Sequence, residues 1–308
     1  MPLTATPRRV LGAVGALAAL GSAFTVGVVA GAGSERTADR SAARPAASTL
    51  LDDAADQIAH AALHPVDRKA LDSAAIQGML QAAGDPWGHW ADGTSRHRTA
   101  SHLVTVTLLD PAATPRVGRI TVRAFDRGVG RDVRTAVDRL RAEHVAGIVL
   151  DLRGNPGGLL DEAVETASAF LDGGPVVSYA RRGAAPVRLD AVGTGDLSTS
   201  LVVLVDGGTA SAAEVVAGAL QDRGRAVLVG SRTFGKGTVQ EPRRLSDGSA
   251  LELTVADYAT PSGRSVDGVG LVPDIDVATG SAPDVAVRRA VQVLTGLVAD
   301  RSVVGVRR

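Results

Sequence analysis

Cysteine is absent from this chain of 308 residues. Its absence excludes disulfide bonds, a thiolate nucleophile, cysteine-ligated zinc and iron–sulfur clusters. Net charge is absent as well, since 33 basic residues balance 33 acidic ones. A protein without a basic field has no general means of holding nucleic acid, so nucleic acid is not expected as a partner.

Aromatic residues and lysine are scarce. The chain has 4 Phe, 2 Trp and 2 Tyr against 36 Gly, so its core has to consist of Ala, Val and Leu with close backbone contacts. Of the 33 basic residues only Lys69 and Lys236 are lysines, which leaves 31 arginines. In a chain that prefers arginine so strongly, each lysine needs a specific reason.

Charged residues are also missing from residues 10–34, a run of 25 that follows Arg8 and Arg9. Because about 20 residues cross a bilayer core, residues 1–34 are predicted to be a signal-anchor. Alternatively, the small residues at 30–32 are a cleavage site and the segment is a signal peptide, or the run is a buried helix. The leading arginines place the remainder outside the cytoplasm, either anchored in the cell membrane or secreted.

Three regions are predicted after this segment: a linker at 35–49, a small helical lead-in module at 50–92 and a catalytic domain at 103–299. The lead-in helices break near His64 and Pro65. The run at 103–108 alternates apolar and polar residues as a half-buried strand does, whereas continuous apolar runs lie at 146–150, 201–205 and 226–229. Helical patterns lie at 131–143, 159–171, 211–223 and 284–297. This alternation predicts an α/β core with buried parallel strands.

The first junction between a strand and a helix reads Asp-Leu-Arg-Gly-Asn-Pro-Gly-Gly, at 151–158. Its simplest interpretation is an ordinary turn. The functional interpretation is that Gly157 and Gly158 allow backbone N–H groups to approach a developing oxyanion.

The second junction places Ser211 at the expected start of a helix after a buried strand. Since Glu214 follows three residues later, Ser211 could serve only as the N-cap of a capping box. It could equally be a nucleophile at the end of a central strand, with the Ala212 amide as an oxyanion donor.

The third junction, GSRTFGKG at 230–237, is close to a P-loop, but Gly237 cannot supply the hydroxyl that binds magnesium and a strand pattern follows. A nucleotide site is therefore rejected. Lys236 is instead a candidate general base, because a lysine can lose its proton and an arginine cannot. A free lysine has a pKa of about 10.4, so burial has to bring it towards 7. Gln240 could hold the amine without adding charge.

Histidine is a weaker candidate for the base. All six histidines precede Ser211 in the chain, and none stands in the three junctions. A Ser-His-Asp triad therefore has no support in the sequence.

The three junctions together resemble the C-terminal processing, or tail-specific, serine peptidases. The matching strings are GIVLDLRGNPGG, GTASAAEVVAGALQDRGRAVLVGSRTFGKGTVQ and YATPSGRSVDGVGLVPDI, between Val145 and Ile275. The resemblance implies Ser211 as nucleophile, Lys236 as general base and Gln240 as third member. It also implies oxyanion donors at Gly157 or Gly158 and at Ala212, and a core similar to the ClpP and crotonase fold.

One departure from that family concerns the PDZ domain of about 80–90 residues that typically precedes the catalytic core. Only 26 residues separate Trp90 from Val117, so a PDZ domain is expected to be missing. Such a domain captures a substrate's C-terminus by strand addition. Tail specificity is therefore not carried over.

The resulting hypothesis is a serine endopeptidase that hydrolyses extracytoplasmic polypeptides and requires no metal or other cofactor. Two alternatives come from other classes: a catalytically silent peptide-binding or scaffold protein on the same fold, and an acyl-CoA enzyme of the crotonase type. The membrane is an expected partner through residues 1–34, and a homo-oligomer or a substrate-delivery partner would be compatible with the missing PDZ domain.

Overall fold

The computed structural model describes residues 47–62, 66–91, 103–110, 115–247 and 249–305. The chain divides into two compact units, 1–58 and 59–308. Helix α1 (Ala47–Ala61) is the described part of the first unit and runs on into the second.

The predicted membrane segment at 1–34 lies outside the described residues, as does the predicted linker at 35–49 apart from its last three residues. Among the helices that are described, none is both long and apolar enough to cross a membrane.

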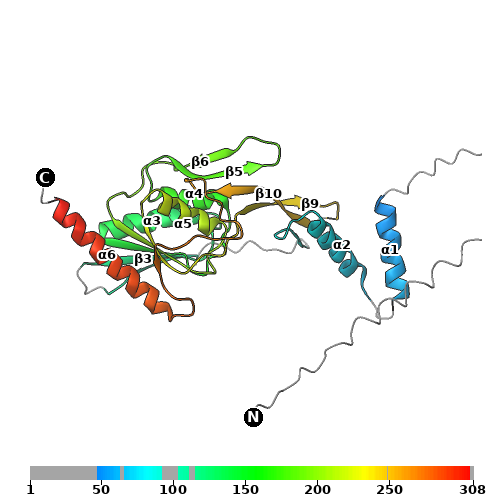
Figure 1. Ribbon diagram of the computed structural model, residues 1–308, viewed down its shortest axis with the longest axis horizontal. Helices are drawn as coiled ribbons and strands as arrows, with labels where there is room; N and C mark the ends of the chain where they lie inside the picture. The colour runs from blue at the N-terminus through cyan, green and yellow to red at the C-terminus, as the bar shows by residue number, and fades with distance from the viewer. Residues whose placement is uncertain (1–46, 63–65, 92–102, 111–114, 248, 306–308) are drawn as a thin grey trace, which may run out of the picture. The chain divides into compact units, whose positions relative to one another are not determined.

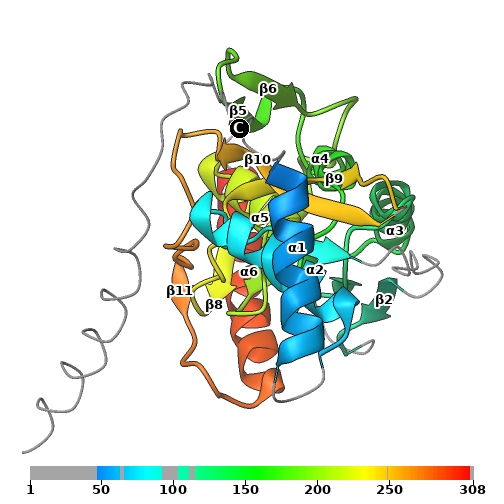
Figure 2. The same ribbon diagram turned by 90° about the vertical axis from the view of Figure 1, so that its right-hand side faces the viewer.

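A six-stranded sheet forms the centre of the second unit (Figure 1). Its strands, in spatial order, are β11 (Ile275–Asp276), β8 (Val227–Gly230), β7 (Ser200–Val205), β4 (Gly147–Asp151), β3 (Val117–Val122) and β2 (Val104–Leu108). All neighbours are parallel except β2, which closes one edge antiparallel to β3. Figure 2 shows β8 and β11 on the side opposite β2. The prediction that the continuous apolar runs form buried parallel strands is thus confirmed.

Helices cover both faces of this sheet, which is what strands apolar on both faces require. On one face lie α3 (Val129–Ala142), α4 (Leu160–Ser168) and α5 (Ala212–Asp222), and on the other α6 (Pro283–Gly305). The backbones approach closely: a Cβ on Gly118 in β3 would lie 2.6 Å from the side chain of Leu140 in α3. A core poor in aromatic residues permits this spacing.

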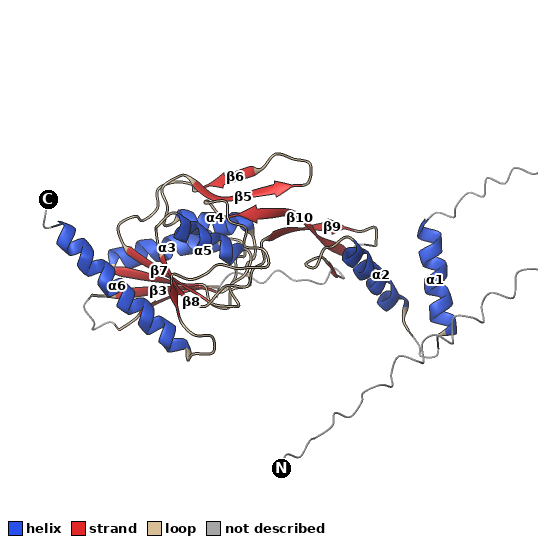
Figure 3. Cartoon of the chain, in the orientation of Figure 1, coloured by secondary structure: helices blue, strands red, loops and turns tan. Residues whose placement is uncertain are grey.

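A second, antiparallel sheet packs against the α4 and α5 side of the helical layer (Figure 3). It consists of β1 (His89–Ala91), β5 (Pro175–Arg181), β6 (Val187–Asp190), β9 (Thr238–Arg244) and β10 (Ala250–Ala259). Helix α2 (Arg68–Ala82) leads into β1. Strand β10 is central, because β1 and β5 pair with one of its edges and β9 with the other.

Strand β1 lies in the lead-in module at 50–92, for which the sequence pattern predicts helices and no strand. It forms because β10 offers backbone partners, with Trp90 opposite Leu251 in the register. Twelve residues, 92–103, then connect β1 to β2.

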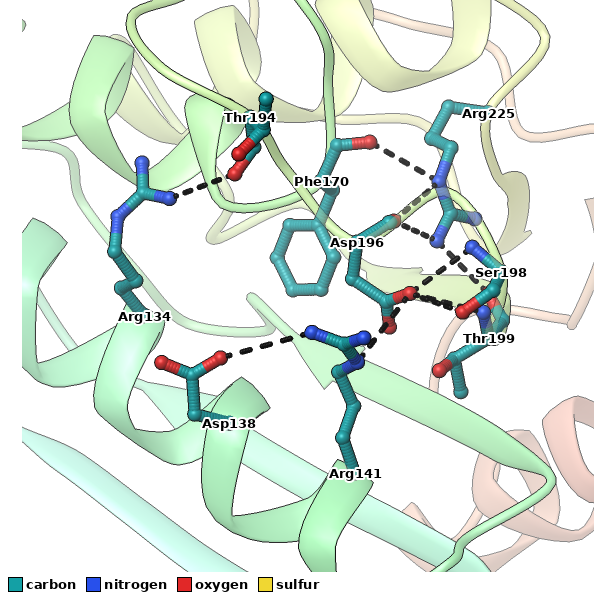
Figure 4. Close-up of polar contacts among 9 residues, drawn as sticks. All are labelled: Arg134, Asp138, Arg141, Phe170, Thr194, Asp196, Ser198, Thr199 and Arg225. Atoms are coloured by element: carbon teal, nitrogen blue, oxygen red, sulfur yellow. Dashed lines mark hydrogen bonds and ion pairs between the residues drawn. The ribbon is translucent and has the colours of Figure 1, made fainter.

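The segment that leads into β7 is held to the helical layer by buried polar contacts (Figure 4). The guanidinium of Arg225 donates to the carbonyls of Phe170 and Asp196, at 3.1 and 2.7 Å. Burial alone would raise the pKa of Asp196, but hydrogen bonds from Thr199 and Ser198 hold it below its ordinary value. These contacts fix the start of the strand whose far end leads to Ser211.

Candidate active site

Ser211 stands between β7 and α5 in a strained backbone conformation. Its φ of +54° and ψ of −120° lie where side chains other than glycine are rarely found. Every residue of α5 from Ala212 to Leu220 is buried, so the helix is held firmly between the two sheets. The strain at Ser211 is therefore supported by packing on the following helix.

Glycine is required next to this serine. Gly157 has φ +103°, and a Cβ on it would lie 2.8 Å from the Cβ of Ser211 and 3.0 Å from the amide nitrogen of Ala212. The loop before α4 can therefore lie against the nucleophile candidate only because residue 157 has no side chain.

Asn155 organises this loop from a fully buried position. Its side-chain nitrogen Nδ2 donates to the carbonyl of Val122 at 3.0 Å, and its side-chain oxygen Oδ1 accepts from the Gly157 N–H at 2.9 Å. Its own carbonyl accepts from the Ala210 N–H at 2.9 Å. The N–H groups of Gly158 and Ala212 make no hydrogen bond to any described residue. Those two amides are therefore free to bind a substrate oxyanion, whereas that of Gly157 is engaged.

Lys236 lies in the loop before β9 and is partly buried. Burial lowers the pKa of Lys236 below its ordinary value, while the carboxylates of Glu252 and Asp85 act in the opposite direction. Its Nζ lies 5.5 Å from the centre of the Trp87 ring, and Trp87 packs against Phe234. An aromatic wall thus shields one side of the amine from water.

One buried carboxylate joins the loops that carry Ser211 and Lys236. The Oε2 atom of Glu214 accepts the N–H groups of Ser211 and Lys236, both at 2.9 Å. Its Oε1 accepts the Thr233 hydroxyl at 2.5 Å and the Gly235 N–H at 2.9 Å. The bond to the Ser211 amide is the one that a capping box predicts from Glu214, but here the carboxylate has three further donors.

Tyr258 makes a second connection between the same loops. Its buried hydroxyl lies 3.0 Å from the carbonyl of Ser211 and 2.8 Å from that of Lys236. Burial, with smaller effects of Glu214 and Asp267, raises the pKa of Tyr258 well above its ordinary value. The phenol therefore stays protonated and acts as a donor.

Gln240 is oriented by a chain of hydrogen bonds that ends at Asp85 in the turn after α2. The Thr254 hydroxyl donates its proton to Asp85 Oδ1 at 2.7 Å. Because that proton is used, the Thr254 oxygen acts as an acceptor for Gln240, whose Nε2 donates to it at 3.3 Å. Nε2 also donates to the Thr238 hydroxyl at 2.7 Å. The side-chain oxygen of Gln240 therefore remains as an acceptor for an amine.

These groups line a cavity of about 340 Å³ beside the N-terminus of α5. Its lining includes Ser211, Ala212, Gly158, Lys236 and Gln240. Gly157 lies behind it, against Ser211. The apolar part of the wall consists of Pro156, Leu159, Leu160, Val215 and Val239. A larger cavity of about 520 Å³, along the carboxyl ends of β3, β4 and β7, contains neither Ser211 nor Lys236.

Several residues that shape the site are not among those predicted from the sequence. Glu214 and Tyr258 belong to the matching strings, but a capping role for Glu214 and a packing role for Tyr258 explain these residues equally well. The sequence pattern carries no signal for a role of Asp85, Asn155 or Glu252 at this site. Several of their contacts join segments that are distant in the chain, such as Asn155 with Val122, Glu214 with Thr233 and Asp85 with Thr254, and the sequence pattern does not reveal them.

The sequence that forms this site matches a known family. The family described as "Peptidase family S41" matches residues 116–277, which is more than half of the chain. The chain belongs to that family. The matched range of this S41 chain lies inside the predicted catalytic domain at 103–299 and includes all three junctions.

Similar proteins carry the names of processing proteases. The S41 chain is 43% identical to "Carboxyl-terminal-processing peptidase 3, chloroplastic" of Arabidopsis thaliana over 168 residues. This aligned region covers 54% of the chain and 32% of the Arabidopsis protein. The chain is 39% identical over 204 residues to a carboxyl-terminal-processing protease of Synechocystis, covering 64% and 48%.

A solved structure, "Photosystem II D1 C-terminal processing protease", superimposes with a TM-score of 0.54 at 37% identity and covers 61% of the chain and 52% of that protein. The S41 chain thus spans between a third and about half of the length of these relatives.

Proposed function

We propose that this S41 chain is a serine endopeptidase in which Ser211 is the nucleophile and Lys236 the general base. The observation that carries the proposal is the shared cavity, which Ser211, Lys236, Gln240 and two unengaged amides line together. The names of the two relatives given above, a processing peptidase and a processing protease, support the same reaction.

The reaction begins when neutral Lys236 accepts the proton of the Ser211 hydroxyl as its oxygen attacks the scissile carbonyl carbon. The N–H groups of Gly158 and Ala212 donate to the oxyanion that forms, and two such donors supply much of the rate enhancement in acyl transfer. The ammonium of Lys236 then gives its proton to the leaving amine, and an acyl-enzyme remains on Ser211.

Water completes the cycle. Lys236, neutral again, accepts a proton from a water molecule that attacks the ester carbonyl, and returns it to the Ser211 oxygen. Within each half of the cycle, after Lys236 has accepted a proton and before it delivers it, Lys236 is an ammonium, and the side-chain oxygen of Gln240 is the proposed acceptor that keeps it directed towards the serine.

Substrate capture and location are further parts of the proposal. Twelve residues between β1 and β2 leave no room for a PDZ domain of about 80–90 residues, so we propose that the chain captures substrates without one, through a delivery partner or self-association. Residues 1–34 are proposed to anchor it in the cell membrane, or to be cleaved on secretion, so that it acts on extracytoplasmic proteins. Membrane fractionation followed by alkaline extraction tests the anchor.

The experiment that tests the proposed chemistry measures degradation of an unfolded model protein by the full chain and its variants. Ser211→Ala and Lys236→Ala should each lower kcat/KM by about 10⁴-fold or more. Ser231→Ala and Lys69→Ala are matched controls, since neither residue lines the cavity and Lys69 is the one other lysine.

Activity that survives Lys236→Ala would refute the dyad. A folded parent that binds peptides without cleaving them would instead support the catalytically silent peptide-binding alternative.

A further inference from the structure

Glu252 on β10 places a carboxylate in the wall of the catalytic cavity. The residue is half-buried and shares this wall with Lys236 and Gln240. Its backbone takes part in the pairing of β10 with β1 and β9, but its carboxylate makes no hydrogen bond and no ion pair with any of the residues that the structure describes. It is close enough to Lys236 to act on it electrostatically, but it does not form a salt bridge with it.

The neighbouring carboxylates differ in this respect, because each has donors of its own. Glu214 and Asp85 each accept four hydrogen bonds. Asp267 accepts the Gly237 N–H, and Glu241 pairs with two arginines. Glu252 is thus the carboxylate at this cavity whose binding capacity is unused within the described residues.

The proposed reaction requires a state in which Glu252 has no positive charge beside it. Lys236 has to be neutral before it can accept the serine's proton, and in that state it offers Glu252 no positive charge. A half-buried carboxylate without a counter-ion is poorly compensated, because the protein around it screens less than water does. A cation that enters the cavity would provide the missing partner.

The rest of the wall suits a long cationic side chain. Leu159, Leu160, Val215 and Val239 present aliphatic surface in the same cavity. Lysine and arginine side chains bury their methylene stems on such surfaces while the charged end binds elsewhere. An apolar wall with one carboxylate therefore matches both parts of a basic residue.

We propose that Glu252 selects polypeptides that place a lysine or arginine side chain in the catalytic cavity, beside the scissile bond. This selection rests on the proposed peptidase function and defines its substrate class. Acidic residues at the same substrate position are rejected by like-charge repulsion.

Selection and catalysis are coupled through Lys236. Glu252 raises the pKa of Lys236 and so opposes the neutral form that acts as base. A substrate cation that pairs with Glu252 offsets this effect and lowers the pKa of Lys236 again. A basic substrate should therefore gain in kcat as well as in binding.

The test uses pairs of peptides that differ only in one residue, Lys or Glu, scanned through the three positions on each side of the cleavage site. Binding is measured with Ser211→Ala, which cannot form the acyl-enzyme, and cleavage with the parent. At one position the Lys peptide should bind about ten-fold more tightly than the Glu peptide, as expected for one partly desolvated ion pair.

Glu252→Gln, in either background, should reduce the Lys preference to about two-fold or less, and Glu252→Lys should reverse it. Glu241→Gln is the matched control, because Glu241 is an acidic residue on the adjacent β9 whose pairing lies outside the cavity. It should leave the preference intact.

An unchanged Lys-to-Glu ratio in Glu252→Gln would overturn the inference even if the parent cleaves both peptides. A ratio that depends on Glu252 in the binding assay, with no cleavage by the parent, would uphold the selection while refuting the proposed peptidase reaction.

Discussion

Replacing Glu214 by glutamine changes one heavy atom at the point where the loops that carry Ser211 and Lys236 meet. The carboxylate has no solvent-exposed surface and accepts four hydrogen bonds, two on each oxygen. An amide has only one acceptor oxygen, so its NH₂ group has to face one of the two donor pairs. On the Ser211 and Lys236 side it would face two N–H groups, and on the other side one N–H and the Thr233 hydroxyl.

The second orientation costs less, because the hydroxyl of Thr233 can turn and accept. Even so, the Gly235 N–H loses its partner in a dry site, which costs about 1–3 kcal/mol. The remaining bonds lose their charge assistance, at about 1 kcal/mol each. We expect Glu214→Gln to lower the free energy of unfolding by about 4 kcal/mol. Since a displacement of about 1 Å can cost 10²-fold in rate, kcat/KM should fall by about that factor.

Urea unfolding at pH 7 measures the stability change, and initial rates on a peptide substrate measure kcat/KM below the unfolding transition. Glu241→Gln is the control, since it removes a carboxylate from a partly exposed ion pair and should cost less than about 1 kcal/mol. A Glu214→Gln variant within about 0.5 kcal/mol of the parent, with unchanged kcat/KM, would refute the view that this carboxylate holds the two loops together.

Three further predictions concern pH and the backbone. For an uncharged peptide, kcat/KM should rise with pH as Lys236 loses its proton, and the midpoint of the rise should lie below the ordinary lysine pKa. Glu252→Gln should move that midpoint to lower pH, because it removes a negative charge that stabilises the ammonium form of Lys236. Gly158→Ala should lower the free energy of unfolding by about 3 kcal/mol or more and abolish peptide cleavage, because the new Cβ would lie 2.1 Å from the backbone carbonyl oxygen of Phe125. The control is Gly154→Ala, at φ +66° with open space around it, which should lower the free energy of unfolding by about 1–2 kcal/mol and remain active. Burial alone would raise the pKa of Asp85, but its hydrogen bonds lower it below the ordinary value. Its contribution to the free energy of unfolding is therefore present at neutral pH and is lost as pH falls through the folded-state pKa. When unfolding is measured at decreasing pH below about pH 4, Asp85→Asn should lose less stability than the parent, and parallel curves would contradict this.

Much of the fold follows from local patterns. The runs at 146–150, 201–205 and 226–229 become β4, β7 and β8, because strands buried on both faces have to be apolar throughout. The antiparallel sheet is less evident. Strand β1 has three residues and no pattern of its own, and it forms only because β10, more than 150 residues later, supplies its partner edge.

The amino-acid sequence by itself determined the chemistry that is available. A lysine-poor, cysteine-free chain with Ser211 and Lys236 at junctions between strands and helices indicates a serine nucleophile with a lysine base, because side-chain chemistry belongs to single residues. Only the tertiary structure decided how those groups are held and what else lines their cavity. Three of the four donors on Glu214, the hydrogen-bond chain from Asp85 to Gln240 and the position of the Glu252 carboxylate, unpaired among the described residues, depend on segments that are distant in sequence. Burial and hydrogen-bond partners across such distances exist only once the chain has folded.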